Sequence, residues 1–182
     1  SLDIIMILAT FPKVKFMVAD WVLTSPLFGA ISRFLGYYSR SEGYEKSLER
    51  LRDDVADGWC LAVFPEGTRS LNGRIKRFHK GAFYLASQLG VPVIPVVFYG
   101  NWRIAPKNQG FNMTEGIAVT EVMTPVSTIS AEYHELTVRI SSLVKAEYAE
   151  LCRKYDSPVN PYFRKALVSS YIYKGPVTEW YV

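Results

Sequence analysis

The stretch CLAVFPEGTRS, residues 60–70, decides the fold class. Its first half is a continuous apolar run without alternation, which is typical of a β-strand buried on both faces. Pro65 ends the strand, and a polar loop rich in glycine and basic residues follows. Apolar residues at helical spacing then occupy 81–90, and a second apolar run occupies 91–99. This alternation predicts an α/β fold with a mixed, largely parallel sheet that helices flank on both faces.

The rest of the chain extends this pattern in both directions. We predict a strand at 14–19, a helix from about Ser25, which would cap it, to Gly36, and a short strand at 37–40. Further helices are expected at 43–57 and 130–155, one or two strands at 117–126, and either a helix or a strand at 4–10. The strands at 14–19, 60–64 and 93–98 are expected to be central neighbours. Residues 1–155 then form one domain, and 156–182 form a proline- and tyrosine-rich tail or a linker to a further region.

Composition excludes several classes of protein. The 182 residues are 49% hydrophobic and 21% charged, which excludes a disordered chain. Two cysteines provide neither a disulfide framework nor a CxxC metal site. The longest apolar stretches are about half of the roughly 20 residues that a membrane-spanning helix needs. The net charge of +4 permits anionic partners such as phosphates or lipid headgroups. One basic loop is a small surface for nucleic acid, so we expect no nucleic-acid partner.

The loop after residue 64 contains the strongest candidates for a binding site. In α/β proteins, ligands bind where strands end, and here Glu66, Gly67, Thr68 and Arg69 follow a buried strand directly. Gly67 allows close approach to a ligand, and Arg69 can hold a phosphate with two hydrogen bonds. The alternative is an ordinary turn whose charged side chains are solvated or paired with each other.

Basic residues gather in the same loop. The cluster comprises Arg69, Arg74, Lys76, Arg77, His79 and Lys80. Together with Arg40, at the end of a neighbouring strand, it suggests a binding site for phosphate or coenzyme A. The alternative is a loop whose charged side chains are simply solvated. His79 is the better of two weak candidates for a general base, because His134 lies in the expected long helix.

FPEGTRS at 64–70 resembles the signature block of the PlsC-like glycerolipid acyltransferases, which include the 1-acylglycerol-3-phosphate acyltransferases. Further segments follow in the family's order. VPVIP at 91–95 is similar to its fourth block, and FHKGA at 78–82 is similar to a segment between the third and fourth blocks. GYYSR at 36–40 resembles a shortened second block, which ends in a phosphate-contacting arginine. The resemblance covers residues 1 to about 155.

The resemblance implies a base that lies outside this chain. The family's first block is His-x-x-x-x-Asp, and SLD at 1–3 resembles its end, so the histidine would stand five residues before Asp3. We therefore expect that the chain is truncated within this block and that, as it stands, it transfers little or no acyl group. The alternative is a relative that lacks the histidine and acts as a non-catalytic phosphate- or lipid-binding domain.

The resemblance also implies the reaction and its participants. Asp3 would be catalytic, and the acceptor's phosphate would be bound by Arg40, Glu66, Gly67, Thr68, Arg69 and Lys80. The donor would be acyl-CoA or acyl-carrier protein and the acceptor a lysophospholipid, with no metal and no organic cofactor. Because both substrates are amphiphiles, we expect a peripheral enzyme at the cytoplasmic face of a membrane. Candidate membrane contacts are the aromatic residues Trp21, Trp102, Phe111 and Trp180.

Overall fold

The computed structural model describes residues 2–26, 28–107 and 113–156. In chain order its elements are α1 (Leu2–Thr10), β1 (Val14–Val18), α2 (Asp20–Thr24), α3 (Phe28–Phe34), β2 (Tyr38–Ser39), a 3-10 turn (Arg40–Glu42), α4 (Tyr44–Ala56), β3 (Cys60–Ala62), α5 (Gly81–Leu89), β4 (Val96–Tyr99), α6 (Asn101–Ile104), β5 (Val119–Val122) and α7 (Tyr133–Tyr155). Apart from Asp156, the predicted tail lies outside the described residues, as do Phe111 and Trp180. No helix in the described part of the chain has the length and apolar character needed to cross a bilayer.

The three strands β2, β1 and β3 form a parallel sheet in that order. Met17 pairs with Tyr38 on one side of β1, and Val14 pairs with Cys60 on the other. Because the strands are parallel, their carboxyl ends lie at one edge of the sheet. The turn that contains Arg40 and the loop that contains the FPEGTRS sequence both leave from that edge, which confirms the α/β interpretation.

The prediction that 93–98 would be a central neighbour of 60–64 is wrong. β4 pairs antiparallel with β5, with Val96 opposite Val122 and Tyr99 opposite Val119, and these two strands form a separate sheet. Side chains of β4 still pack against the residues of β1 and β3. An apolar run predicts that a strand is buried, but it does not predict which other strand pairs with it.

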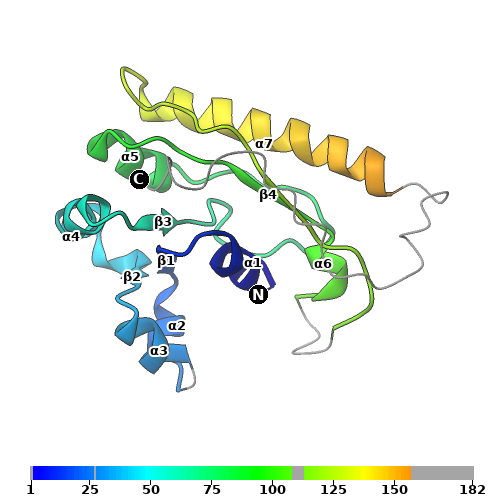
Figure 1. The fold of residues 1–182 in the computed structure, drawn as a ribbon, viewed down its shortest axis with the longest axis horizontal. Coiled ribbons are helices and arrows are strands. Elements are labelled where there is room, and N and C mark those ends of the chain that lie inside the picture. Colours follow the sequence, from blue (N-terminus) through cyan, green and yellow to red (C-terminus); the bar gives the residue numbers. More distant parts are fainter. Residues whose placement is uncertain (1, 27, 108–112, 157–182) are drawn as a thin grey trace.

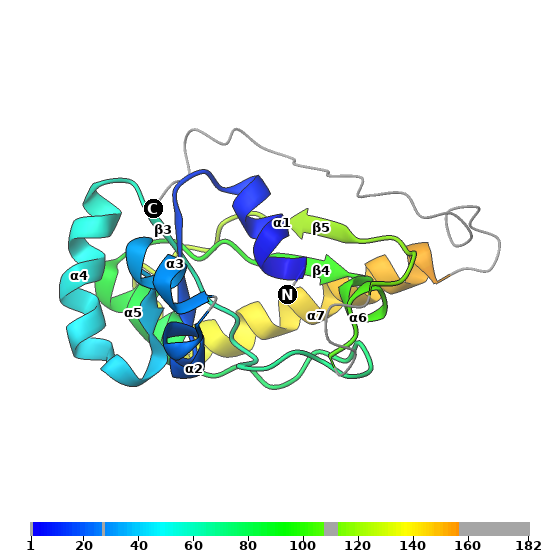
Figure 2. The same cartoon turned by 90° about the horizontal axis from the view of Figure 1, so that it is seen from below.

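The helices enclose these sheets and give the molecule two different sides. α7 lies along β4 on one side, while α2 and α3 project on the opposite side (Figures 1 and 2). The main core lies between α7 and the β4–β5 sheet, and Val97, Val119, Leu136 and Ile140 are among its buried residues.

The helix predicted from Ser25 differs from the structure. Ser25 is the residue that follows α2, its carbonyl accepts a hydrogen bond of 2.8 Å from the N–H of Gly29, and α3 begins at Phe28 and ends at Phe34. The apolar spacing of α3 does not mark a buried face either, because Ile31 is 55% exposed and Phe34 is 90% exposed. A periodic apolar stripe shows that a helix needs an apolar partner without showing what that partner is.

Candidate active site

Asp3 lies in the first turn of α1 and is held there by Asn101. The side-chain amide of Asn101 donates a hydrogen bond from Nδ2 to Oδ1 of Asp3. Asn101 is 9% exposed and follows Gly100, whose φ of 83° turns the chain at the end of β4. A Cβ atom at position 100 would lie 1.8 Å from the carbonyl oxygen of Ile117, so only glycine fits. The turn thereby places the amide of Asn101 against α1.

Glu66 is a partly buried carboxylate close to Asp3. Its Oε2 accepts a hydrogen bond of 2.8 Å from the backbone N–H of Lys76, which connects the two ends of the basic loop. Burial raises the pKa of Glu66 above its ordinary value, the interactions with Lys76 lower it, and the negative charge of Asp3 raises it further. The two predicted carboxylates are therefore near enough to interact.

Gly67 and Arg40 meet at the same edge. Gly67 has a φ of 66°, and a Cβ atom there would lie 3.2 Å from Nη1 of Arg40 and 3.4 Å from the imidazole of His79. The backbone N–H of His79 donates to the carbonyl of Pro65 at 2.8 Å, which folds the loop back on itself. The predicted phosphate-binding Arg40 thus lies against the FPEGTRS loop, and no carboxylate in the described part of the chain forms an ion pair with it.

Asp20 fixes the turn in which Arg40 stands. Its Oδ1 accepts hydrogen bonds from the hydroxyls of both neighbours of Arg40, Ser39 and Ser41, the latter at 2.7 Å. These hydrogen bonds hold the pKa of Asp20 below its ordinary value. The carboxylate joins the segments that follow β1 and β2, so it positions Arg40.

Arg69 and Thr68 point toward a different partner. Nη2 of Arg69 donates to the backbone carbonyl of Lys107 at 3.0 Å, and Nζ of Lys107 donates to Oγ1 of Thr68 at 2.9 Å. Both residues of the motif are exposed. Lys107 therefore adds a third cation to the two arginines that the sequence suggested.

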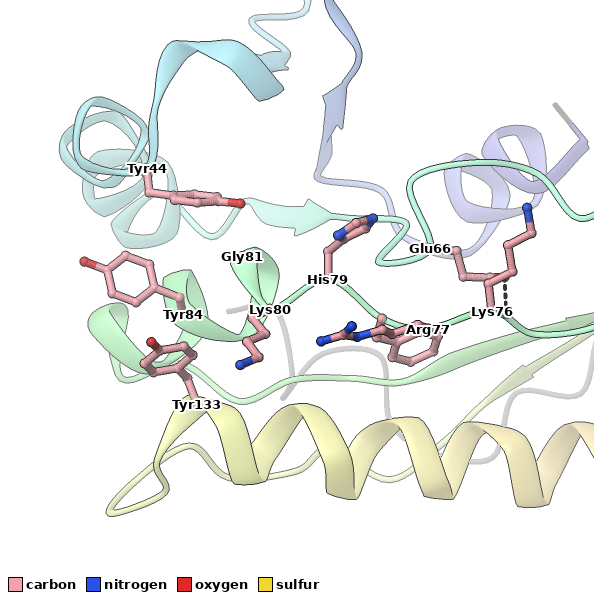
Figure 3. Close-up of a pocket in the computed structure, with 10 residues that line it drawn as sticks. Tyr44, Glu66, Lys76, Arg77, His79, Lys80, Gly81, Tyr84 and Tyr133 are labelled. Atoms are coloured by element: carbon pink, nitrogen blue, oxygen red, sulfur yellow. Dashed lines mark hydrogen bonds between the residues drawn. The ribbon is translucent and has the colours of Figure 1, made fainter.

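Lys80 lines a cavity of about 750 Å³ beside this loop. It immediately precedes α5, and its side chain points toward Tyr133 and away from Glu66 (Figure 3). The residues that line the cavity are Tyr44, Glu66, Lys76, Arg77, Phe78, His79, Lys80, Gly81, Tyr84 and Tyr133.

The structure thus joins the predicted site residues in pairs. Asp3 interacts with Glu66, and Arg40 lies beside Gly67, whereas Lys80 faces the tyrosines of the cavity. Sequence reasoning missed Asn101, Asp20 and Lys107. The first two had a signal, because both follow the ends of strands, where ligand sites are expected. Lys107 stands in a loop without such a signal.

Comparison with known proteins identifies the family. The family model described as Acyltransferase matches residues 1–99. A chloroplastic 1-acyl-sn-glycerol-3-phosphate acyltransferase of Brassica napus is 34% identical over 109 residues, which cover 58% of this chain and 32% of that protein. The 1-acyl-sn-glycerol-3-phosphate acyltransferase of Saccharomyces cerevisiae is 34% identical over 140 residues, which cover 70% of this chain and 45% of that protein. The chain thus spans about a third of the length of the Brassica relative and less than half of the yeast one.

A solved structure resembles the fold as well. The crystal structure of PlsC, the 1-acyl-sn-glycerophosphate acyltransferase of Thermotoga maritima, superposes with a TM-score of 0.64 and 25% sequence identity over 75% of this chain and 56% of that one. The family model includes Asp3, Arg40 and the whole FPEGTRS loop. The chain therefore belongs to the PlsC-like acyltransferase family.

Proposed function

We propose that this chain transfers a fatty acyl group from a thioester, acyl-CoA or acyl-carrier protein, to the hydroxyl of a lysophosphatidate-like acceptor in phospholipid biosynthesis. The observation that carries the proposal is the FPEGTRS loop, which places Glu66 near Asp3 and Gly67 against Arg40. The relatives named 1-acyl-sn-glycerol-3-phosphate acyltransferases support the choice of acceptor.

The reaction needs a base beside Asp3, and we assign this role to a histidine five residues before it. The imidazole takes the proton of the acceptor hydroxyl while the oxygen attacks the thioester carbonyl. The new C–O bond forms, the C–S bond breaks, and the imidazolium returns its proton to the departing thiolate. Asp3 holds the ring in the required tautomer and stabilises its positive charge, as aspartates do beside other catalytic histidines. Asn101 in turn fixes the carboxylate of Asp3.

The acceptor's phosphate binds in the cationic part of the site. Arg40 and Arg69 form charge-assisted hydrogen bonds with its oxygens. Glu66, Gly67 and Thr68 shape the loop, and the left-handed φ of 66° at Gly67 keeps the backbone open where a side chain would crowd Arg40. Lys107, which already contacts Thr68, adds positive charge.

The enzyme meets its substrates at a membrane surface, where it binds peripherally from the cytoplasmic side. The support is the apolar surface of α2 and α3, where Trp21 is 69% exposed, Ile31 55% and Phe34 90%. Trp102 is only partly exposed and lies on α6. Large apolar side chains gathered on one exposed face are typical of a surface that contacts membrane or protein.

The test compares the chain as it stands with a version extended N-terminally by three residues, which places a histidine five residues before Asp3. Thiol release from acyl-CoA is measured with lysophosphatidate as acceptor. We expect the extended version to be about 10²- to 10⁴-fold faster, as for a positioned general base. Equal rates would remove this histidine from the mechanism and transfer the role to His79. Absence of transfer in both versions, with lysophosphatidate still bound, would favour a non-catalytic lipid-binding domain.

A further inference from the structure

A second cavity, of about 470 Å³, is lined by none of the predicted site residues. It is formed by residues 72–75 of the basic loop, by α6 and by the C-terminal half of α7. α6 and the C-terminal end of α7 lie at the same end of the molecule (Figures 1 and 2). Asn101 in α6 contacts Asp3, whereas the next two residues, Trp102 and Arg103, line the second cavity. The second cavity is therefore separate from the candidate active site.

A glycine allows the basic loop to form one wall of this cavity. Gly73 is buried and has a φ of 75°. A Cβ atom there would collide with the indole nitrogen of Trp102 and lie 2.9 Å from the hydroxyl oxygen of Tyr148, so only glycine fits. Oδ1 of Asn72 accepts a hydrogen bond of 3.2 Å from the backbone N–H of Arg74. The turn that presents Arg74 to the cavity is thus fixed by packing and by a hydrogen bond.

Positive charge is in excess around the second cavity. Arg74, Arg103 and Lys145 line it, and Asp156 is the carboxylate among the lining residues. The carboxylate is already occupied, because it forms an ion pair of 2.8 Å with Arg103. Arg74 and Lys145 are exposed, and neither forms an ion pair with any residue that the structure describes. Three cations against one carboxylate leave an excess of two positive charges.

The other titratable groups of the cavity do not offset this excess. Burial raises the pKa of the Tyr148 hydroxyl to about 12, and burial also raises the pKa of the Cys152 thiol above its ordinary value of 9.0. Both groups are therefore neutral at pH 7. A ligand that carries two negative charges would balance the cavity.

We propose that the second cavity binds a phosphate monoester, whose oxygens are held by Arg74 and Lys145. A phosphate monoester carries a charge of about −1.5 to −2 at pH 7, which matches the excess, whereas a carboxylate or a phosphodiester carries only one negative charge. The planar guanidinium of Arg74 suits two phosphate oxygens, and the ammonium of Lys145 adds a flexible point charge. The volume beyond the phosphate accommodates the organic part of the ester. An acceptor bound at Arg40 and a ligand in the second cavity can then be present at the same time.

The indole N–H of Trp102 is a direct probe of binding, because Trp102 lines the second cavity. Its signal in a two-dimensional ¹H–¹⁵N spectrum of the chain is identified by its absence in Trp102→Phe. We expect titration with glycerol 3-phosphate to shift this signal to saturation. Dimethyl phosphate, a diester with one negative charge, is expected to bind at least about tenfold more weakly. A signal that does not move would overturn the proposal, and equal affinity for the two compounds would overturn the assignment to a monoester.

Variants separate the second cavity from the acceptor's site. Arg74→Gln and Lys145→Gln are each expected to weaken the binding of glycerol 3-phosphate at Trp102 about tenfold, because each removes a charged phosphate contact. Arg139→Gln, on the exposed surface of α7 outside the cavity, is the matched control and keeps the affinity. Arg69→Gln removes a proposed contact to the acceptor and leaves the response of Trp102 unchanged. Thermal unfolding checks that each variant is folded.

Two results of this series would overturn the proposal. Equal losses in Arg139→Gln and Lys145→Gln would show diffuse attraction rather than a site. Loss of the Trp102 response in Arg69→Gln would show that the signal senses only the acceptor's site. Failure of acyl transfer is distinguishable from both results, because the spectra are recorded without an acyl donor and without turnover.

The natural phosphate monoester has two possible sources, a soluble metabolite or a lipid headgroup. Co-sedimentation compares vesicles of phosphatidylcholine that contain either phosphatidate, a monoester, or phosphatidylglycerol, a diester. A preference for phosphatidate that the double variant Arg74→Gln, Lys145→Gln loses would support the cavity and identify the headgroup as its ligand. Saturable binding of glycerol 3-phosphate without that preference would support a soluble ligand. Failure of both would overturn the proposal.

Discussion

Glu66 lies in a place that disfavours a charged carboxylate. Burial and the nearby Asp3 raise its pKa, while the interactions with Lys76 only partly offset them. In the unfolded chain the carboxyl loses its proton near its ordinary value of 4.5, earlier than in the folded chain. Stability therefore falls as pH rises from 4.5 to the raised pKa, because the folded state holds the proton more strongly there.

Glu66→Gln removes this loss of stability at high pH, because the glutamine side chain carries no charge. Its amide oxygen can still accept the hydrogen bond from the N–H of Lys76. We expect a higher unfolding temperature than that of the parent chain at pH 7, and a difference that disappears as the pH falls below 4.5. Differential scanning calorimetry across this range measures it. A difference that stays constant with pH would show that the gain does not come from the charge of Glu66.

In the proposed reaction, Asn101 acts through Asp3, whose carboxylate accepts its hydrogen bond. Asn101→Ala in the histidine-extended version is expected to lower kcat about tenfold, as loss of a hydrogen bond to a charged group does, with little change in the KM of either substrate. Asn101→Asp places a carboxylate against Asp3 and is expected to lower kcat further and to shift the pH profile upward. A rise in KM without loss of kcat would indicate that Asn101 shapes a binding site instead.

At the scale of single residues, motif reasoning identified the side chains that stand in a known pattern. Gly67 and Arg40 meet as expected, because a shared motif carries its spatial arrangement with it. Asn101 donates a hydrogen bond to Asp3, and Asp20 accepts hydrogen bonds from Ser39 and Ser41, the neighbours of Arg40. The place of both residues after a strand end signals a ligand site, but their partners lie about 100 and 20 residues away in the chain, and no local pattern identifies them.

At the scale of the elements, a clasp joins the end of α7 to β4 and α6. Asp156 accepts a hydrogen bond of 2.7 Å from the hydroxyl of Tyr99 and forms an ion pair of 2.8 Å with Arg103. Burial alone would raise the pKa of Asp156, but these two partners outweigh it and hold the pKa below the ordinary value of 3.8. The carboxylate therefore contributes stability above pH 3.8, and the contribution is lost as pH falls through the lowered pKa.

Asp156→Asn is expected to lower the free energy of unfolding at pH 7 by about 1 kcal/mol, a value that allows for solvent screening of a partly exposed pair. This corresponds to an unfolding temperature about 2–4 °C lower. Asp53→Asn, an exposed substitution on α4, is the control and is expected to have a much smaller effect. If the two variants unfold at the same temperature, the clasp does not stabilise α7.

Element boundaries followed from local signals where such signals exist. α5 ends at Leu89, and Gly90, with a φ of 66°, is the left-handed cap that stops it, as predicted. α4 and α7 begin and end within three residues of the expected positions. The pairing of β4 with β5 was not predictable in this way, because burial on both faces looks the same in sequence whichever strand lies alongside. The exposure of α3 could not be predicted either, since periodicity alone does not name the partner of an apolar face.

The whole molecule has one side with exposed apolar side chains, which is the side that we propose contacts the membrane. α2 and α3 lie on the side opposite α7 and carry Trp21, Ile31 and Phe34 (Figure 1). The segments that follow β1 and β2 connect this side to the edge of the sheet where Arg40 lies. In the proposed orientation, the hydrogen bonds of Asp20 connect the membrane-facing α2 with the turn that contains Arg40.

Phe34→Ser tests this orientation, because Phe34 is 90% exposed and its loss removes apolar surface without opening the core. Transfer of a phenylalanine side chain out of water contributes about 1.5–3 kcal/mol when burial is complete, so we expect binding to vesicles of phosphatidylcholine and phosphatidylglycerol to weaken about tenfold. Val138→Ser is the matched control, since Val138 is 67% exposed on α7, on the opposite side of the molecule. Vesicle co-sedimentation over a range of lipid concentrations gives both partition coefficients. If the two substitutions weaken partitioning equally, or neither does, the face formed by α2 and α3 does not dock on the membrane, and its apolar residues must have another partner.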